Sequence, residues 1–291
     1  MKHIFSLLFN PKGHALKRIK LILTLFSVVL AGIEVQAQGK LFIIGGGDRP
    51  ISLTQRMFDE AGITKLDYVV ILPMASSEPD SAVIFSSDQY ESMGYKRGVG
   101  FDSNSLKRQS ALDSLSNAKL IFISGGDQAR FMKEVINTPI EIAIKKAFTK
   151  GGMVAGTSAG AAVMSKKMIT GNELKQPESD SPFKTIEAGN VEVTQGLGLL
   201  DEGIIVDQHF VKRKRLNRLI SVLLENPGKL CIGIDESTAL LVKKNKAEVV
   251  GSSQIIVLRN KSKVKHTESG LLGAENIQLD VLLPGQKFNL K

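Results

Sequence analysis

A serine within a run of small residues is the first candidate for chemistry in this sequence. The stretch Ala155-Gly156-Thr157-Ser158-Ala159-Gly160-Ala161 follows two apolar residues and precedes a run that can form a helix. The pattern Gly-x-Ser-x-Gly is typical of a nucleophile on a sharp strand-to-helix turn, but Gly, Ala and Ser also form ordinary tight turns. A serine hydroxyl is a poor nucleophile until a neighbouring base takes its proton. Catalysis at Ser158 therefore requires a base.

The histidine count restricts the choice of that base. The sequence contains four histidines, and two of them lie in the first 37 residues, which we expect to be removed. His266 lies in a lysine-rich segment, which we expect to be exposed to solvent. His209 follows the apolar run Ile204–Val206, where a strand would present it at the edge of a sheet. If Ser158 works with a histidine, that histidine is His209; the competing interpretation is a structural histidine bonded to the backbone.

A histidine base must in turn be oriented by a third group. Asp235 and Glu236 follow another apolar run, Cys231–Ile234. In a continuing strand the two acids would point to opposite faces, so the spacing leaves both open. The chain order serine, histidine, acid differs from the serine, acid, histidine order of the α/β-hydrolases, so the serine motif does not indicate that family.

An acyl-transfer site also needs backbone N–H groups aimed at the developing oxyanion. Ala159 follows the serine at the expected helix start and supplies one such group. A glycine of Ser124-Gly125-Gly126-Asp127, and we assign Gly126, supplies the other, because a residue without Cβ allows a close backbone approach.

A cationic run, Lys212-Arg213-Lys214-Arg215-Leu216-Asn217-Arg218, comes directly after the candidate base. On a helix Arg215 and Arg218 share a face, whereas Arg213 and Arg215 lie about 160–200° apart, so all three meet only if the helix starts between them. A solvated basic face or a nucleic-acid patch is the alternative. No aromatic residues interleave as in a nucleic-acid platform. Because arginine forks suit carboxylates, we expect an acidic substrate and no nucleic acid.

The first 37 residues are typical of a secretory signal peptide. A basic region precedes the 13-residue apolar run Leu21–Ile33, and Val35-Gln36-Ala37 is a small-x-small cleavage signal. Thirteen residues are fewer than the roughly 20 that span a bilayer, so we expect export to the periplasm or outside the cell and no lasting membrane anchor. Removal of five basic residues and one acid lowers the net charge from +9 to +5. The remaining single cysteine, Cys231, allows no internal disulfide and is expected to be buried.

The spacing of apolar runs predicts an α/β fold with a mostly parallel central sheet covered on both faces. Ligand sites in such sheets lie beyond the carboxyl ends of the strands, where the polar motifs above occur. Expected strands are 41–44, 68–72, 120–123, 153–155, 204–206 and 231–234, and expected helices are 103–115, 140–149, 159–164 and 213–224. After Glu236 the pattern favours an antiparallel extension. The polar stretch 172–190 is expected to be a loop that is either disordered or a lid over the site.

Taken together, these motifs resemble the peptidase family that contains cyanophycinase and the aspartyl dipeptidases, the S51-type serine peptidases. The resemblance spans about residues 40–245, and the third of its four blocks resembles the cyanophycinase branch most specifically. The blocks, in order, are Ile123-Ser124-Gly125-Gly126-Asp127-Gln128, Gly156-Thr157-Ser158-Ala159-Gly160-Ala161, the run from Asp207 to Leu219, and Gly233-Ile234-Asp235-Glu236-Ser237-Thr238-Ala239.

The resemblance implies a three-layer α/β/α fold similar to class I glutamine amidotransferase domains. It implies Ser158 as nucleophile, His209 as base and Glu236, rather than Asp235, as the orienting acid. It further implies a substrate site lined by Gln128, Asp207, Gln208, Arg213, Arg215 and Arg218. Two histidines and one cysteine, far apart after residue 37, make no metal-ligand cluster, so we expect no metal and no cofactor. Cyanophycinases hydrolyse a poly-aspartate bearing arginine side chains into β-aspartyl-arginine dipeptides.

The sequence thus predicts a signal peptide at 1–37 and one peptidase domain at 38–291, with a core at about 40–260. The alternatives are an α-aspartyl dipeptidase and a non-catalytic periplasmic binding protein of the same fold, and a homodimer is left open. One departure from the family pattern is the first glycine turn, Gly45-Gly46-Gly47-Asp48-Arg49-Pro50, where an acidic pair is expected after the glycines.

Overall fold

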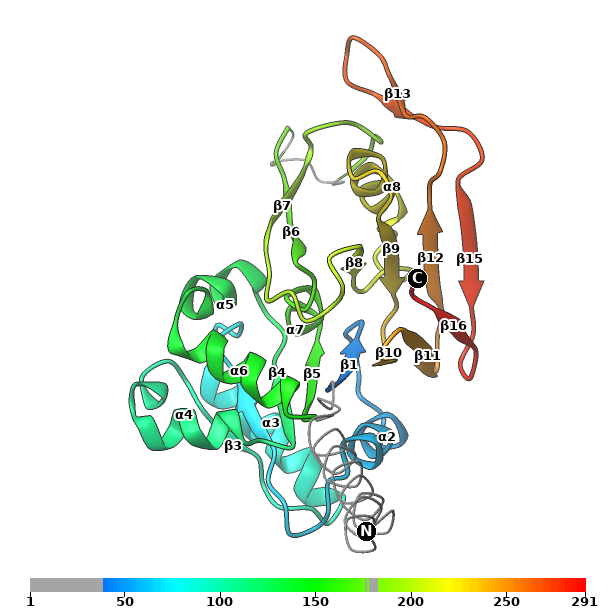
Figure 1. Cartoon of the computed structure of the whole chain (residues 1–291). Helices are drawn as coiled ribbons and strands as arrows, with labels where there is room; N and C mark the ends of the chain where they lie inside the picture. Colours follow the sequence, from blue (N-terminus) through cyan, green and yellow to red (C-terminus); the bar gives the residue numbers. More distant parts are fainter. Residues whose placement is uncertain (1–38, 176, 178–182) are drawn as a thin grey trace, which may run out of the picture. The chain divides into compact units, whose positions relative to one another are not determined.

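A central sheet of eight strands forms the middle layer of the fold (Figure 1). The computed structural model describes residues 39–175, 177 and 183–291, so the predicted signal peptide lies outside the described residues. The strand order is β16-β11-β10-β1-β5-β4-β2-β3. The parallel strands are β1 (Lys40–Ile44), β5 (Met153–Thr157), β4 (Leu120–Ile123), β2 (Val70–Leu72) and β3 (Val99–Gly100). The antiparallel strands are β10 (Thr238–Lys243), β11 (Lys246–Gly251) and β16 (Lys287–Asn289).

Helices cover both faces of this sheet, because its strands alternate apolar side chains between two cores. Phe42 and Phe122 pack with Leu53 and Tyr90 on one face, under α2 (Ile51–Ala61) and α3 (Pro79–Ser92). The other face lies under α4 (Gln109–Ser116), α5 (Gln128–Val135), α6 (Pro139–Thr149) and the short α7 (Ala159–Ala162). The expected three-layer α/β/α architecture and the antiparallel extension are confirmed.

A second sheet carries the segments around the candidate base and acid. Its order is β15-β12-β9-β8, with β8 (Ile204–Asp207) and β9 (Leu230–Ile234) parallel and with β12 (Ile255–Arg259) and β15 (Gln278–Leu282) antiparallel. Helix α8 (Leu216–Glu225) packs Leu219, Val222 and Leu223 onto this sheet. The apolar runs of β8 and β9 thus belong to a separate sheet, which their pattern did not distinguish because both sheets bury such runs on two faces.

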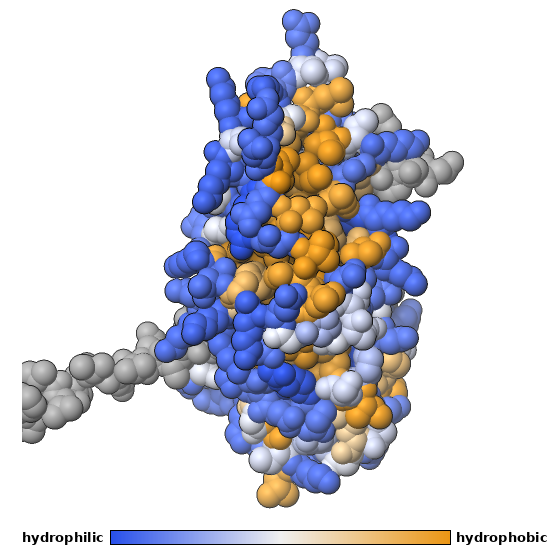
Figure 2. Space-filling model, turned by 90° about the vertical axis from the view of Figure 1, so that its right-hand side faces the viewer, coloured by the Kyte–Doolittle hydropathy of each residue, from blue (hydrophilic) through white to orange (hydrophobic). Residues whose placement is uncertain are grey.

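Two small hairpins complete the fold. The first pairs β6 (Lys167–Glu173) with β7 (Val191–Gln195), and the second pairs β13 (Lys265–His266) with β14 (Leu272–Gly273). Figure 2 shows a band of apolar side chains on the face that includes the C-terminal strands, where Leu279 and Val281 of β15 are about half exposed. A homodimer stays a prediction. Among the described residues, no helix is both long and apolar enough to cross a bilayer.

Some predicted boundaries were wrong. The helix expected from Arg213 begins at Leu216, because the preceding residues form turns with Lys214 at φ 53°. The helix expected at 103–115 is divided into a 3₁₀ turn (Ser105–Lys107) and α4. The polar stretch 172–190 begins inside strand β6 rather than as a loop. Cys231 is fully buried, as expected, and burial raises the pKa of its thiol.

Candidate active site

Ser158 stands on a sharp turn between β5 and α7. Its backbone adopts φ 53° and ψ −109°, a conformation that L-residues rarely occupy, and its N–H donates to the Ile44 carbonyl at 3.0 Å. The flanking glycines are required by space. A Cβ on Gly156 would lie 2.4 Å from the Gly160 carbonyl oxygen, and one on Gly160 would lie 2.3 Å from that of Ile123. The turn is therefore closed tightly around an outward-pointing serine.

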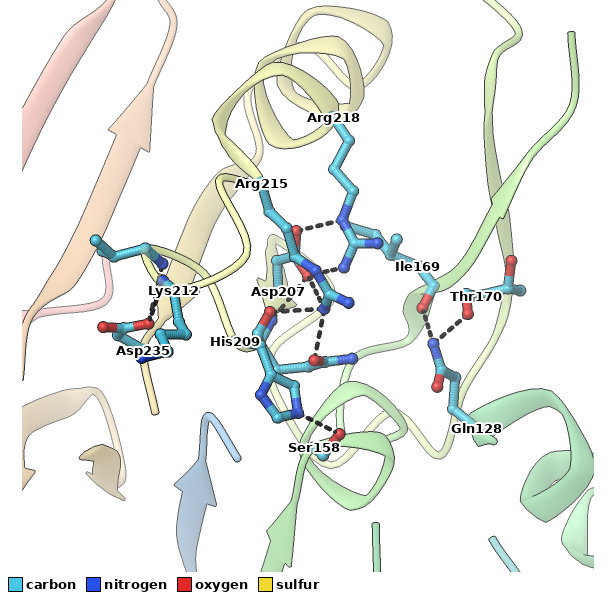
Figure 3. Close-up of polar contacts among 12 residues, drawn as sticks. Gln128, Ser158, Ile169, Thr170, Asp207, His209, Lys212, Arg215, Arg218 and Asp235 are labelled. Atoms are coloured by element: carbon cyan, nitrogen blue, oxygen red, sulfur yellow. Dashed lines mark hydrogen bonds and ion pairs between the residues drawn. The ribbon is translucent and has the colours of Figure 1, made fainter. Parts of the chain in front are cut away.

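A chain of hydrogen bonds links this serine to a histidine and a carboxylate. Ser158 Oγ lies 2.9 Å from His209 Nε2 (Figure 3), and His209 Nδ1 lies 2.6 Å from Glu236 Oε1. An ionised carboxylate can only accept, so Nδ1 carries the proton and Nε2 accepts from the serine hydroxyl. The three residues come from the ends of strands in two different sheets. The arrangement can make the serine a nucleophile.

The structure separates the two acids that the spacing left open. Asp235 accepts hydrogen bonds from the N–H groups of Val211 and Lys212 at 3.0 and 2.9 Å, and from the Ser253 hydroxyl at 2.7 Å. It thus holds the turn that follows His209 (Figure 3). Glu236 alone of the pair reaches the imidazole.

The glycine turn after β1 shapes the pocket for the imidazole. The Gly45 carbonyl accepts from the His209 N–H at 2.7 Å, which holds His209 in a left-handed conformation with φ 48°. At Gly46, where φ is 113°, a Cβ would lie 2.2 Å from His209 Cε1, and at Gly47 it would lie 2.7 Å from the Glu236 side chain. Sequence reasoning missed this role; the signal was the glycine run at the end of an apolar strand.

Substitution of Gly46 by alanine is expected to lower kcat by about 100-fold or more, because it displaces the imidazole by a large part of an ångström. The matched control is Gly62→Ala, since Gly62 also has a positive φ, 66°, but a Cβ there would meet no atom within 4 Å. Both variants carry backbone strain, so thermal unfolding compares that cost directly. Equal losses of kcat in the two variants would contradict the assignment.

Two backbone amides, one directly after Ser158 and one in the glycine turn that follows β4, are the predicted oxyanion donors. Within the described ranges, the N–H groups of Gly126 and Ala159 donate to no protein acceptor. Gly126 has φ 136°, and a Cβ on it would lie 2.1 Å from the Ala75 carbonyl oxygen, so only glycine fits there. A Cβ on its neighbour Gly125 would lie 3.4 Å from the Ser158 Cβ, which places this glycine turn against the nucleophile.

Burial is the largest influence on the pKa of His209, and it holds that pKa below its usual value. The hydrogen bond to Glu236 opposes this shift, whereas the positive charges of Arg213 and Arg215 add to it. The imidazole is therefore neutral, and able to accept a proton, to a lower pH than a free histidine.

Comparison with known proteins agrees with this geometry. The profile of Peptidase family S51 matches residues 41–250. A cyanophycinase of Trichormus variabilis is 32% identical over 268 residues, covering 86% of this chain and 85% of that protein. A cyanophycinase of Geminocystis herdmanii is 31% identical over 276 residues, covering 87% and 94%.

The chain belongs to peptidase family S51. It is accordingly a serine-type peptidase. Solved structures support the fold: a peptidase from an acI-B1 actinobacterium has a TM-score of 0.60 at 22% identity, covering 87% of this chain and 98% of that one. A putative peptidase E from Listeria monocytogenes has a TM-score of 0.51 at 16% identity, covering 75% and 100%.

The three arginines after His209 in this S51 peptidase differ in the number of hydrogen bonds and ion pairs that they form within the protein. Arg218 is 2% exposed and donates hydrogen bonds to the Asp207 carboxylate from two nitrogens. The distance from its Nε to Asp207 Oδ2 is 2.7 Å. Arg215 donates to the Gln208 carbonyl and side-chain oxygens at 2.7 and 2.6 Å. Arg213 is exposed and forms no ion pair with any described residue. The helix starts at Leu216, after both Arg213 and Arg215, so only Arg218 of the three lies on α8.

Gln128 is the remaining residue predicted at the site, and it lies on the side of β6 (Figure 3). Its Nε2 donates to the backbone carbonyls of Ile169, at 2.9 Å, and Thr170. These two hydrogen bonds hold strand β6 beside the start of α5, where Gln128 is the first residue of the helix.

The pH dependence of activity is expected to follow His209. Because the neutral imidazole is the active form, kcat/KM should fall on the acid side with a midpoint below about 6.5, the usual histidine pKa. Arg213→Gln removes a positive charge that lowers this pKa, so its acid limb should move to higher pH. Lys214→Gln is the control, because the neighbouring Lys214 is not among the largest influences on the pKa of His209. A shift of the limb to lower pH in Arg213→Gln would contradict the expectation.

Proposed function

We propose that this S51 peptidase is an exported serine exopeptidase that cleaves aspartyl peptide bonds. We propose cyanophycin, a poly-aspartate with arginine side chains, as its substrate and β-aspartyl-arginine dipeptides as the products. The observation that carries the proposal is the Ser158–His209–Glu236 hydrogen-bond chain beside an arginine-rich turn. The similarity to cyanophycinases over most of the chain supports the substrate.

In the proposed reaction Ser158 Oγ attacks the carbonyl carbon of the scissile amide while His209 Nε2 takes the hydroxyl proton. The oxyanion of the tetrahedral intermediate is held by the N–H groups of Gly126 and Ala159. His209 then gives its proton to the leaving amine, and the C–N bond breaks to leave an acyl-enzyme ester. A water molecule, deprotonated by His209, hydrolyses the ester and restores the serine. Glu236 stays ionised and stabilises the imidazolium.

The substrate side of the proposal rests on charge. Arg213 presents an exposed guanidinium near His209 that pairs with no acid in the described part of the chain, and Arg215 is partly exposed beside it. The carboxylates of this polymer suit such a surface. We propose that Arg218, which is buried on Asp207, supports this surface, and that Gln128, Asp207 and Gln208 complete the wall of the site.

A substrate panel on purified protein tests the proposal. Hydrolysis of cyanophycin to β-aspartyl-arginine, faster than that of Asp-X dipeptides, is the expected result. Preference for Asp-X dipeptides would instead identify an α-aspartyl dipeptidase. A fluorophosphonate probe should label Ser158, and absence of both labelling and turnover would favour a non-catalytic binding protein.

Export is tested separately from activity. The intact chain, produced in a bacterial host, is expected to be recovered outside the cytoplasm with Gln38 as its first residue. Replacement of Ala37 by a bulky residue should block this processing. Recovery of the full-length chain in the cytoplasm alone would contradict the proposed export.

A further inference from the structure

One segment of the chain joins α8 to the C-terminal hairpin, which is formed by β13, β14 and the turn between them. This return segment, residues 183–190, leads back into β7. Phe183, at its start, is 9% exposed, and its ring lies 5.5 Å from the guanidinium carbon of Arg218. Phe183 also has φ 57°, a left-handed conformation that is costly for a bulky residue and persists only where neighbouring contacts impose it.

One polar stripe of α8 binds the return segment along its length. Asn217 donates to the Phe183 carbonyl at 3.1 Å, Ser221 Oγ accepts from the Glu187 N–H at 3.2 Å, and Glu225 accepts from the Gly189 N–H at 2.8 Å. These helix residues are four apart, so they lie on one face of α8. The stripe therefore holds the backbone of the segment in register with the helix that carries Arg218.

The C-terminal hairpin binds the other edge of the same segment. Ala188 N–H donates to the Gly270 carbonyl and Leu272 N–H donates to the Ile186 carbonyl, both at 2.9 Å. The hairpin lies beyond residue 250, where the family match ends. The return segment is thus held between α8 on one side and the C-terminal hairpin on the other.

We propose that Phe183 is a positioning residue for the substrate site and that the C-terminal hairpin holds it in place. The guanidinium carbon of Arg218 lies over the Phe183 ring, and the same guanidinium donates to Asp207 through two nitrogens. Asp207 and Gln208 precede His209 directly, and Gln208 binds Arg215. The contact with Phe183 therefore holds the buried Asp207–Arg218 ion pair in place, and this ion pair supports the exposed arginine surface. This inference rests on the proposed function of that surface.

Substitution at Phe183 tests the role of the ring. Phe183→Ala is expected to raise KM for cyanophycin about 3- to 10-fold with kcat changed less than about twofold, because the triad keeps its geometry. Phe183→Tyr keeps the ring and should restore KM, whereas Phe183→Leu keeps only apolar volume and should not. Phe85→Ala is the matched control, because Phe85 forms a stack of the same kind on Arg49, at 5.3 Å.

The path of the effect is tested by combining substitutions. If Phe183 acts through Arg218, Phe183→Ala adds little to the KM of Arg218→Lys, and the two effects are not additive. Glu225→Ala removes the hydrogen bond from the Gly189 N–H and should also raise KM. Glu202→Ala breaks a surface ion pair with Lys166 and should leave KM unchanged. Additive effects of Phe183→Ala and Arg218→Lys, or an unchanged KM in Phe183→Ala, would overturn the proposal.

A second measurement separates this inference from the proposed function. Amide hydrogen exchange of the unliganded protein should become faster across residues 207–218 in Phe183→Ala and stay unchanged in Phe85→Ala. Unchanged exchange in Phe183→Ala would overturn the positioning role. Failure of the parent protein to hydrolyse cyanophycin would instead overturn the proposed substrate, and the exchange result would still decide the role of Phe183.

Discussion

Ser158→Ala is expected to lower kcat on the order of 10⁴- to 10⁶-fold while the protein stays folded, the range seen when a nucleophile of this type is removed. The Oγ atom forms the covalent bond to the substrate, and no other described hydroxyl lies against His209 Nε2. The Ser158 backbone keeps its N–H bond to Ile44, which alanine also makes. Steady-state hydrolysis of the preferred substrate measures the loss, and thermal unfolding verifies the fold.

A nearby serine provides the control for this result. Ser124 is 4% exposed at the end of β4, and its hydroxyl has no hydrogen-bond partner within the described part of the chain. Removal of an unpaired buried hydroxyl is expected to be nearly neutral. Ser124→Ala should therefore keep kcat within about threefold, and its Ser158 should still react with a fluorophosphonate. Substantial turnover by Ser158→Ala would exclude Ser158 as the nucleophile.

Asp207→Asn is expected to lower the free energy of unfolding by about 3–5 kcal/mol, the cost of leaving one partner of a buried ion pair uncompensated. Asp207 and Arg218 are 1% and 2% exposed, and the carboxylate accepts from two guanidinium nitrogens. Arg215, with a nitrogen 3.7 Å from the same carboxylate, would also lose its counter-charge. Chemical denaturation measures the change.

Two further variants distinguish a buried charge effect from general disruption. The double variant Asp207→Leu/Arg218→Met removes both charges and should be more stable than Asp207→Asn. Asp280→Asn breaks the more exposed pair between Asp280 and Arg259, at 2.7 Å, and should cost less than about 1 kcal/mol. Equal losses in Asp207→Asn and Asp280→Asn would contradict the importance of burial.

Local pattern predicted the main buried strands and the polar or glycine-rich motifs at their ends, but not helices α2, α3 and α5. Short apolar runs followed by polar or glycine-rich turns marked the strands, because a buried strand must end where the chain returns to solvent. The shortage of histidines left His209 as the partner of Ser158, and their contact at 2.9 Å agrees with that reasoning. These inferences need only the chemistry of single residues and their distance along the chain.

What the sequence by itself determined is therefore the α/β class, the strand ends and a short list of reactive residues. The spacing left Asp235 and Glu236 open and the family resemblance implied Glu236, whose contact with the imidazole the tertiary structure shows. Only the tertiary structure decided that β8 and β9 form a second sheet. The tertiary structure also decided that Gly46 leaves space for the His209 imidazole and that the Arg218 guanidinium lies over the Phe183 ring. The physical reason is that these contacts join residues distant in sequence, and their geometry depends on how separate strands and turns pack against one another.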